Sequence, residues 1–153
     1  MEIEILEMTK ETLPGVAKIE AECFSDAWDE IALANTLSND SIRYFIACKD
    51  GSVLGYIGFY DLIDELSIIN IAVTEKSRRT GIAKSLLSAL NEYFINSKAN
   101  RITLEVRASN VCAISLYRSF GFSCVGEKDN YYTKPKEKAY FYQLEKNDAD
   151  TEL

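Results

Sequence analysis

The sequence contains no histidine, no CxxC pair and no apolar run long enough to span a bilayer. Without histidine, the chain lacks the commonest general base and the usual partner of a catalytic cysteine. The four cysteines (Cys23, Cys48, Cys112 and Cys124) also have no imidazole to join them in a metal site. We therefore expect no bound metal and no nucleophilic cysteine, and we expect the four thiols to be small buried hydrophobic groups.

The start of the chain, Met1-Glu2-Ile3-Glu4, lacks the basic residues and the apolar core of a signal peptide. Together with the lack of a membrane-spanning run, this predicts a cytoplasmic protein. A net charge of −7 disfavours broad binding to nucleic acid and favours cationic partners. The length of 153 residues predicts one domain over residues 1–146, followed by an acidic, disordered tail over 147–153.

Hydrophobic periodicity predicts strands and helices in the order β-α-α-β-β-β-α-β-α-β-β, with a hairpin turn at Asp50-Gly51, an N-cap at Asn110 and a helix stop at Gly121. A polar loop with Asn130 and Pro135 is expected before the last strand. Helices are expected over 13–23, 28–37, about 81–99 and 111–120, and strands around 3–5, 44–48, 53–60, 68–73, 102–106, 122–125 and 139–144. This order predicts an α/β (α+β) fold with a mixed, mostly antiparallel sheet of about seven strands and helices on both faces.

The segment from residue 76 to residue 84 carries four cations, Lys76, Arg78, Arg79 and Lys84, and no acid. It follows a buried strand and runs into an amphipathic helix. A helix start offers unpaired backbone N–H groups and a positive dipole end, and Gly81, which lacks a Cβ, lets an anion approach them. The pattern therefore indicates a diphosphate site, although a solvated basic turn capped by Thr80 explains the same residues.

Several motifs resemble those of the GCN5-related N-acetyltransferases (GNAT) and, within them, the RimI-type ribosomal-protein-alanine N-acetyltransferases. The phosphate loop Q/R-x-x-G-x-G/A of that family is matched by Arg78-x-x-Gly81-x-Ala83. The RimI-type signature is resembled by Leu104-Glu105-Val106-Arg107-Ala108-Ser109-Asn110, Ala113-Ile114, Leu116-Tyr117, Phe120-Gly121-Phe122 and Asn130-Tyr131-Tyr132. The resemblance covers nearly the whole chain.

This resemblance implies a sheet splayed between strands four and five, with acetyl-CoA as cosubstrate in the gap. The backbone of Ile71, Ala72 and Val73 would bind the pantetheine arm, and Asn110 would reach the cosubstrate from the next helix start. The family resemblance places the diphosphate on the loop and helix start formed by Arg78, Arg79, Thr80, Gly81, Ile82, Ala83 and Lys84.

The resemblance also implies that Glu105 is the general base and Tyr117 the general acid, with Tyr117 touching the cosubstrate as well. Tyr117 lies seven residues after Asn110, which is two helical turns, so both residues face one side of the helix. A phenol with a pKa near 10 stays protonated at pH 7 and can protonate a departing thiolate. By pattern alone, Glu105 is a solvated strand residue and Tyr117 a core aromatic. Tyr131 or Tyr132 could take the role of the acid instead.

The function implied is acetyl transfer to the N-terminal amine of a protein, in particular the N-terminal alanine of a small-subunit ribosomal protein. The acidic chain would attract such a basic tail. We expect no direct contact with nucleic acid or membrane, and we expect the protein to be a monomer or a weak dimer. The family builds its peptide groove from the loop Ser25-Asp26-Ala27-Trp28 and from residues 130–138, and Asp26 and Glu30 could face the tail. The alternatives are a polyamine or small-amine acetyltransferase and a noncatalytic acyl-CoA-binding module, which would need neither Glu105 nor Tyr117.

Overall fold

The computed structural model describes residues 2–24 and 27–147. By its contacts the chain divides into two compact units, the first made of Met1–Asp61 with Ile69–Tyr93 and the second of Leu62–Ile68 with Phe94–Leu153. This division into compact units does not test the prediction of one domain over residues 1–146, which therefore stays a prediction. Residues 148–153 of the predicted tail, and Ser25 and Asp26 of the predicted acceptor loop, lie outside the described residues.

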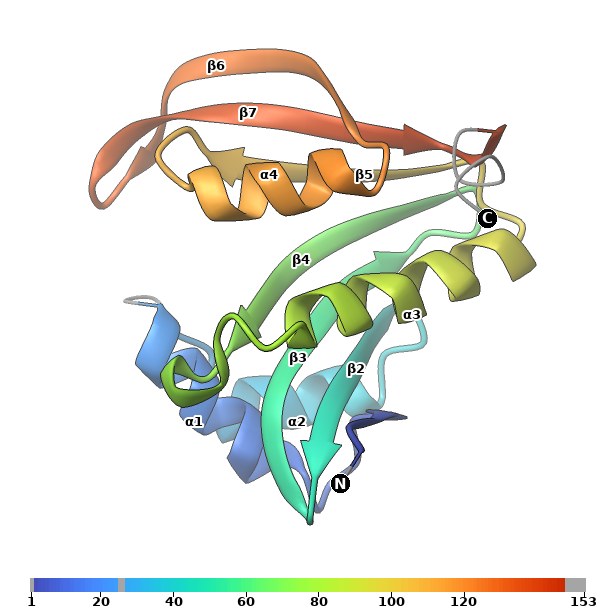
Figure 1. Cartoon of the computed structure of the whole chain (residues 1–153), viewed down its shortest axis with the longest axis vertical. Coiled ribbons are helices and arrows are strands. Elements are labelled where there is room, and N and C mark those ends of the chain that lie inside the picture. The colour runs from blue at the N-terminus through green and yellow to red at the C-terminus, as the bar shows by residue number, and fades with distance from the viewer. Residues whose placement is uncertain (1, 25–26, 148–153) are drawn as a thin grey trace. The chain divides into compact units, whose positions relative to one another are not determined.

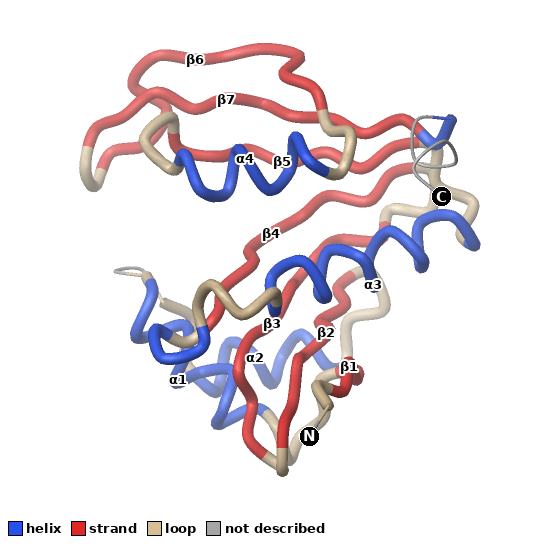
Figure 2. The backbone as a smooth tube through the Cα atoms, viewed as in Figure 1, coloured by secondary structure: helices blue, strands red, loops and turns tan. Residues whose placement is uncertain are grey.

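Helices and strands follow one another along the chain in the order that the periodicity predicts (Figures 1 and 2). The α-helices are α1 (Leu13–Cys23), α2 (Glu30–Leu37), α3 (Ile82–Asn96) and α4 (Val111–Ser119), and a short 3-10 helix, η1, covers Glu75–Ser77. The strands are β1 (Glu4–Glu7), β2 (Ile42–Lys49), β3 (Ser52–Asp61), β4 (Glu65–Val73), β5 (Arg101–Arg107), β6 (Ser123–Thr133) and β7 (Lys136–Glu145). Among the described residues, no helix combines the length and the apolar character needed to cross a membrane.

The strands form one seven-stranded sheet in the order β1-β2-β3-β4-β5-β7-β6. The pair β4–β5 is parallel, with Glu65 opposite Arg101 and Ser67 opposite Thr103, whereas β5 pairs with β7 in antiparallel fashion along its whole length. The predicted mixed and mostly antiparallel sheet is therefore confirmed.

Helices cover both faces of the sheet within the first unit. Side chains alternate along β2 and β3, so Tyr44 and Tyr56 join the core cluster with α1 and α2, while Phe45 and Phe59 point to the other face. There, both rings contact Tyr93 of α3, at centroid distances of 5.9 and 5.4 Å. Figure 1 shows α3 on the near side of these strands and the faded ribbon of α2 behind them.

The turn and cap residues predicted from the sequence are confirmed. Asp50 and Gly51 join β2 to β3 with φ of 52° and 81°, the pair of positive angles that a tight hairpin turn requires. The Asn110 side chain caps α4 by accepting the N–H of Ala113 at 3.2 Å. Gly121 follows the end of α4 with φ of 92°, which glycine adopts without a steric penalty.

Several boundaries differ from the prediction by two residues or more. Helix α2 begins at Glu30, because Asp29 is its N-cap and accepts the N–H of Ala32. Strand β4 begins at Glu65, three residues earlier than predicted. Most of the predicted polar loop belongs to β6, which runs to Thr133 with an irregular register around Asn130. This exposed edge strand is held by backbone hydrogen bonds to β7, so it needs no apolar pattern.

The prediction of buried thiols is wrong for two of the four cysteines. Cys48 is buried on β2 and Cys23 is partly buried at the end of α1, but Cys112 and Cys124 are exposed. Cys112 lies in the first turn of α4 and Cys124 lies on the edge strand β6, so neither faces a core. Residue type alone does not reveal which face of an element a small side chain takes.

Candidate functional site

The basic turn predicted to bind an anion joins β4 to α3 in the first unit. Gly81 has φ of 86°, and a Cβ built at this position would meet no atom within 4 Å, so the space beside the backbone is open. Arg79 also has a positive φ, 66°, which costs a residue with a side chain roughly 1–2 kcal/mol. The loop thus follows an uncommon backbone path just before the helix.

The start of α3 presents backbone donors ahead of its own hydrogen-bond ladder. The N–H of Ser85 donates to the carbonyl of Gly81 at 3.0 Å, so the N–H groups of residues 82–84 precede the first bond of the helix. The Thr80 hydroxyl donates to the carbonyl of Ser77 and closes the preceding turn. These donors and the helix dipole suit an anion, as the sequence predicts for this position.

The Arg78 side chain makes contacts inside the first unit. Its Nε donates to the carbonyl of Val73 at 3.3 Å, and a terminal nitrogen lies 3.5 Å from the sulfur of Cys23. Arg78 therefore links the end of β4 to the end of α1 and supports the loop. Arg79 and Lys84, the other predicted cosubstrate-binding cations, are exposed.

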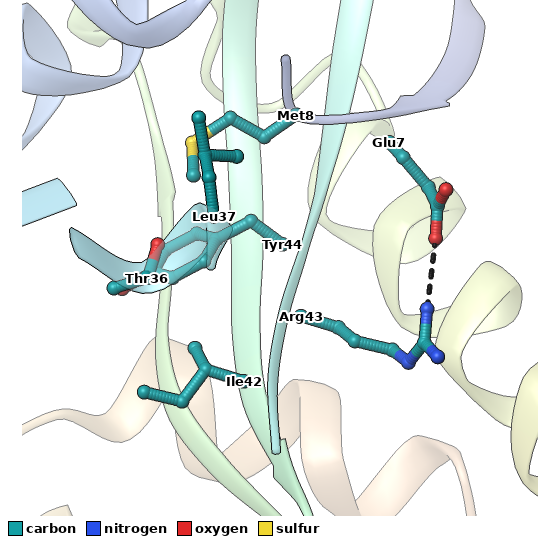
Figure 3. Close-up of a pocket in the computed structure, with 7 residues that line it drawn as sticks. All are labelled: Glu7, Met8, Thr36, Leu37, Ile42, Arg43 and Tyr44. Carbon is teal, nitrogen blue, oxygen red and sulfur yellow. Dashed lines mark hydrogen bonds and ion pairs between the residues drawn. The ribbon is translucent and has the colours of Figure 1, made fainter. Parts of the chain in front are cut away.

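Two of the hollows in the protein lie among the described residues of the first unit. One, of about 660 Å³, is lined by residues along the length of α1, by the turn between β2 and β3 with the first residues of β3, and by residues 74–77. The other, of about 160 Å³, lies beside β2 and is lined by Thr36, Tyr44 and their neighbours (Figure 3). Near it, Arg43 and Glu7 point toward each other and form an ion pair at 3.2 Å. This second hollow is smaller than the 300–1,000 Å³ typical of small-molecule sites.

Glu105, the predicted base, is exposed on β5 in the second unit and lies opposite Phe141 of β7. Its Oε2 accepts a hydrogen bond from the hydroxyl of Tyr131 at 2.6 Å. This bond raises the pKa of Tyr131. The Tyr131 ring is edge-on to Phe141 at 5.5 Å and to Tyr132 at 5.2 Å. A group of aromatic rings therefore packs together beside the Glu105 carboxylate.

The other two candidate acids lie in the same unit. Burial, followed by the nearby charge of Glu105, raises the pKa of Tyr132 to about 12, and the Arg107 guanidinium lies 4.2 Å from its ring centre. Tyr117 is only 4% exposed and packs on Phe122 at 5.6 Å. Burial, then the proximity of Tyr132, raises the pKa of Tyr117. The structure thus gathers the predicted base and the three candidate acids in the second unit.

The sequence reasoning missed a network that supports this cluster. Arg107 donates to the carbonyls of Pro135 and Lys134 at 2.9 and 3.1 Å and pairs with Glu137 at 3.3 Å. Glu137 also accepts the N–H of Ser109 at 2.6 Å. Hydrogen bonding from Ser109, and then the charge of Arg107, lowers the pKa of Glu137. Arg107 and Ser109 belong to the RimI-type signature quoted above, and that signature was the signal that could have pointed to this network.

Asn110 follows Ser109 of this network in the sequence, and its side chain caps the helix that begins at the next residue. Its Oδ1 accepts the N–H of Ala113 at the start of α4, so the predicted N-cap is confirmed. Its predicted contact with the cosubstrate stays a prediction. Tyr117, two turns further along α4, is the buried residue of that helix.

Comparison with known proteins shows the family of the chain. The model of the acetyltransferase (GNAT) family matches residues 12–122. The chain therefore belongs to this family of acetyltransferase enzymes.

Within that family, the chain resembles RimI-type enzymes. It is 34% identical over 133 residues to a putative [ribosomal protein bS18]-alanine N-acetyltransferase of Bacillus subtilis, covering 86% of this chain and 88% of the relative. The crystal structure of the ribosomal-protein-S18-alanine N-acetyltransferase of Escherichia coli matches with a TM-score of 0.86, at 29% identity and with 94% of each chain covered. Arabidopsis thaliana NAA60 in complex with acetyl-CoA has the same fold, with a TM-score of 0.83 at 21% identity, covering 95% of this chain and 99% of that chain.

Proposed function

We propose that the protein transfers the acetyl group of acetyl-CoA to the N-terminal α-amine of a protein, and that its acceptor is the N-terminal alanine of a small-subunit ribosomal protein. Glu105 acts as the general base and Tyr117 as the general acid. Two relatives whose names state this activity on ribosomal protein S18 support the acceptor. We expect the enzyme to act in the cytoplasm.

The reaction is a direct transfer. The amine nitrogen attacks the thioester carbonyl carbon, a C–N bond forms and the C–S bond breaks. Glu105 takes the proton that the amine loses, and Tyr117 gives a proton to the departing thiolate. These roles fit the two environments, because Glu105 is exposed and hydrogen-bonded while the buried Tyr117 retains its proton.

The ionisation of amines favours an α-amine as acceptor. An α-amino group has a pKa near 7.8, so about a tenth of it is unprotonated at pH 7. A lysine side chain, with a pKa near 10.4, costs about 3.5 kcal/mol more to deprotonate. A single carboxylate such as Glu105 can deprotonate an α-amine more easily than a lysine side chain. This argument supports an N-terminal acceptor over a lysine.

For the cosubstrate, we propose that the first unit holds the diphosphate. The N–H groups of Arg79 to Lys84 would donate to it, and the backbone of Ile71, Ala72 and Val73 would bind the pantetheine arm. Arg78 would contribute by supporting the loop. Asn110 and Tyr117 are the other residues that we propose as cosubstrate contacts. The open space beside Gly81 and the donors at the start of α3 support this assignment.

The observation that carries the proposal is that one unit contains both an exposed carboxylate, Glu105, and a deeply buried phenol, Tyr117. A module that only binds acyl-CoA needs neither group. Glu105 and Tyr117 come from β5 and α4, and the Tyr131 hydroxyl is within hydrogen-bond distance of the carboxylate. A base and an acid held in different environments are what acetyl transfer from a thioester requires.

The test is acetyl-CoA turnover with matched acceptors. One peptide has a free N-terminal alanine and no lysine, the second has a blocked N-terminus and one lysine, and the third acceptor is a polyamine. Mass spectrometry locates the added acetyl group. We expect modification of the free α-amine at the highest kcat/KM. Turnover of the polyamine alone would contradict the proposal in favour of a small-amine enzyme, and no turnover of any acceptor would favour a binding module.

A further inference from the structure

Arg107 makes contacts in the second unit that the proposed chemistry does not use. It lies on β5 two residues after Glu105, so the two side chains leave the same face of the sheet. The Arg107 side chain is 33% exposed, yet neighbours hold it on several sides. A long side chain loses rotamer freedom when it is held in this way, and its contacts must offset that loss. These contacts therefore bear on what this arginine does.

Arg107 binds the turn between β6 and β7 with one planar group. Its Nη1 donates to the carbonyl of Pro135 at 2.9 Å, and its Nη2 donates to the carbonyl of Lys134 at 3.1 Å. Nη1 also lies 3.3 Å from the carboxylate of Glu137, and the guanidinium carbon lies 4.2 Å from the centre of the Tyr132 ring. The flat, forked guanidinium can make all these contacts at once, whereas the compact ammonium of a lysine cannot. Arg107 thus fastens the end of β6 and the following turn to β5.

Strand β6 is irregular where Tyr131 lies. Its register with β7 leaves residues 129–131 opposite the single residue Lys138, and Asn130 has φ of 56°. Extra residues of this kind form a β-bulge, which departs from the regular ladder and turns side chains in new directions. The pairing of β6 with β7 therefore does not by itself fix the direction of the Tyr131 side chain, and other contacts must do so.

A chain of contacts runs from Arg107 to the Glu105 carboxylate. Arg107 lies over the Tyr132 ring, and that ring is edge-on to the Tyr131 ring at 5.2 Å. The Tyr131 hydroxyl in turn donates to Oε2 of Glu105 at 2.6 Å. All four residues belong to the second unit. Because Oε2 is held in this way, the carboxylate keeps one orientation, which also directs its other oxygen.

We propose that Arg107 is a positioning residue for the general base: by holding the Tyr132 ring and the turn after β6, it keeps the Tyr131 hydroxyl on the Glu105 carboxylate. This inference rests on the proposed function, because it takes Glu105 as the base. Arg107 acts through the two tyrosines rather than on the reacting atoms. A change at Arg107 should therefore lower kcat by the same route as loss of the Tyr131 hydroxyl.

A double-mutant cycle tests this shared route. The variants are Arg107→Lys, Tyr131→Phe and the combination of the two, and the measurement is kcat at saturating acetyl-CoA and alanine peptide. We expect each single variant to lower kcat about 5-fold, because each loses the same hydrogen bond to Glu105. The double variant should also lose about 5-fold, whereas two independent effects would multiply to about 25-fold.

Hydrogen exchange gives a second readout that needs no turnover. Mass spectrometry follows the backbone amides of residues 129–134. Their exchange should be faster in Arg107→Lys than in the wild type, because the bulge and the turn lose the contacts that hold them to β5. Glu137→Gln removes the charge that pairs with Arg107, so it should change both the exchange and kcat in the same direction, but less.

Arg101→Lys is the matched control. Arg101 lies on the same strand, and its guanidinium pairs with Glu65 at 3.6 Å and with Glu145 at 3.4 Å. The same substitution therefore loosens ion pairs of similar length on β5 while it leaves the contacts of Arg107 in place. Arg101→Lys should match the wild type both in kcat and in the exchange of residues 129–134.

The two assays separate the possible outcomes. Faster exchange, together with a double variant no slower than Tyr131→Phe, supports the inference. Unchanged exchange, unchanged kcat in Arg107→Lys, or losses that multiply in the double variant overturns it. Where Arg107→Lys does not fold, Glu137→Gln takes its place in the cycle. If the wild type acetylates no N-terminal peptide, or if Glu105→Gln keeps wild-type turnover, the proposed function fails, and the role of Arg107 with it, whatever the exchange shows.

Discussion

The proposed phosphate loop of the first unit, residues 78–84, and the tyrosine cluster of the second unit are built in opposite ways. The tyrosine cluster consists of Glu105 with Tyr117, Tyr131 and Tyr132. The loop relies on backbone groups: a glycine with positive φ, an open space beside it and the first N–H groups of α3. The cluster relies on side chains that come from β5, α4 and β6 and are held by hydrogen bonds and ring contacts. The difference suggests that the loop tolerates changes of side chain, whereas the cluster depends on individual functional groups.

The largest effect is expected at Glu105, where one functional group has no substitute. Glu105→Gln keeps the shape but removes the proposed base, so kcat should fall by about 100-fold or more. The measurement is turnover at saturating acetyl-CoA and alanine peptide. Glu145→Gln, on the neighbouring strand β7, serves as control and should retain wild-type turnover. Wild-type turnover in Glu105→Gln would break the comparison, because the cluster would then tolerate loss of its central side chain.

Tyr117→Phe should have the next largest effect and lower kcat about 10- to 100-fold, because a thiolate leaves more easily than an amine and needs the acid less. Burial raises the pKa of Tyr117, so the protonated form persists at higher pH than for an ordinary tyrosine. The kcat of the wild type should therefore show no loss from Tyr117 ionisation up to about pH 10.

The control for this change is Tyr131→Phe. Tyr131 donates to Glu105, so removing its hydroxyl should alter turnover less than Tyr117→Phe if Tyr117 is the acid. The reverse order, measured as kcat under the same conditions, would assign the acid role to Tyr131. The comparison between these two variants decides between Tyr117 and Tyr131 as the phenol that protonates the thiolate.

In the first unit, a backbone change should matter more than a change of charge. Gly81→Ala places a Cβ in open space, so it disturbs no packing, but it forces an L-residue to φ of 86° at a cost of roughly 1–2 kcal/mol. Calorimetry should show acetyl-CoA binding weakened about 10-fold. Arg79→Ala keeps the same backbone demand and removes a charge, so it should weaken binding less than about 5-fold. A larger loss in Arg79→Ala would show that this loop, too, depends on side chains.

The smallest effect is expected for a change at Glu137, which should alter the free energy of unfolding in a way that depends on pH. The pKa of Glu137 is lowered in the folded state, so its ionised form stabilises the fold above the ordinary carboxyl pKa, near 4.3. That contribution is lost as the pH falls through the lowered value. Glu137→Gln should therefore lower the free energy of unfolding at pH 7 and make little difference in strong acid. Urea unfolding at both pH values measures this, and an equal loss at both would exclude an electrostatic origin.

The local structure was predictable because its signals lie close together in the sequence. Asp50-Gly51, Asn110 and Gly121 are turn and cap residues whose backbone demands do not depend on distant parts of the chain, and all three behave as predicted. The loop with Gly81 belongs to the same class. The length of strand β6 was mispredicted because it depends on backbone pairing with β7, which the polar side chains of β6 do not indicate.

The sequence by itself determined the order of elements, the anion-suited start of α3 and, through its motifs, the family and the residue types of the candidate site. Only the tertiary structure decided which of those residues meet. The bond of Tyr131 to Glu105 joins positions 26 residues apart, and Glu20 reaches Asn70 across 50 residues. Periodicity assigns a side chain to a face, but burial and partners arise from segments that the folded chain brings together.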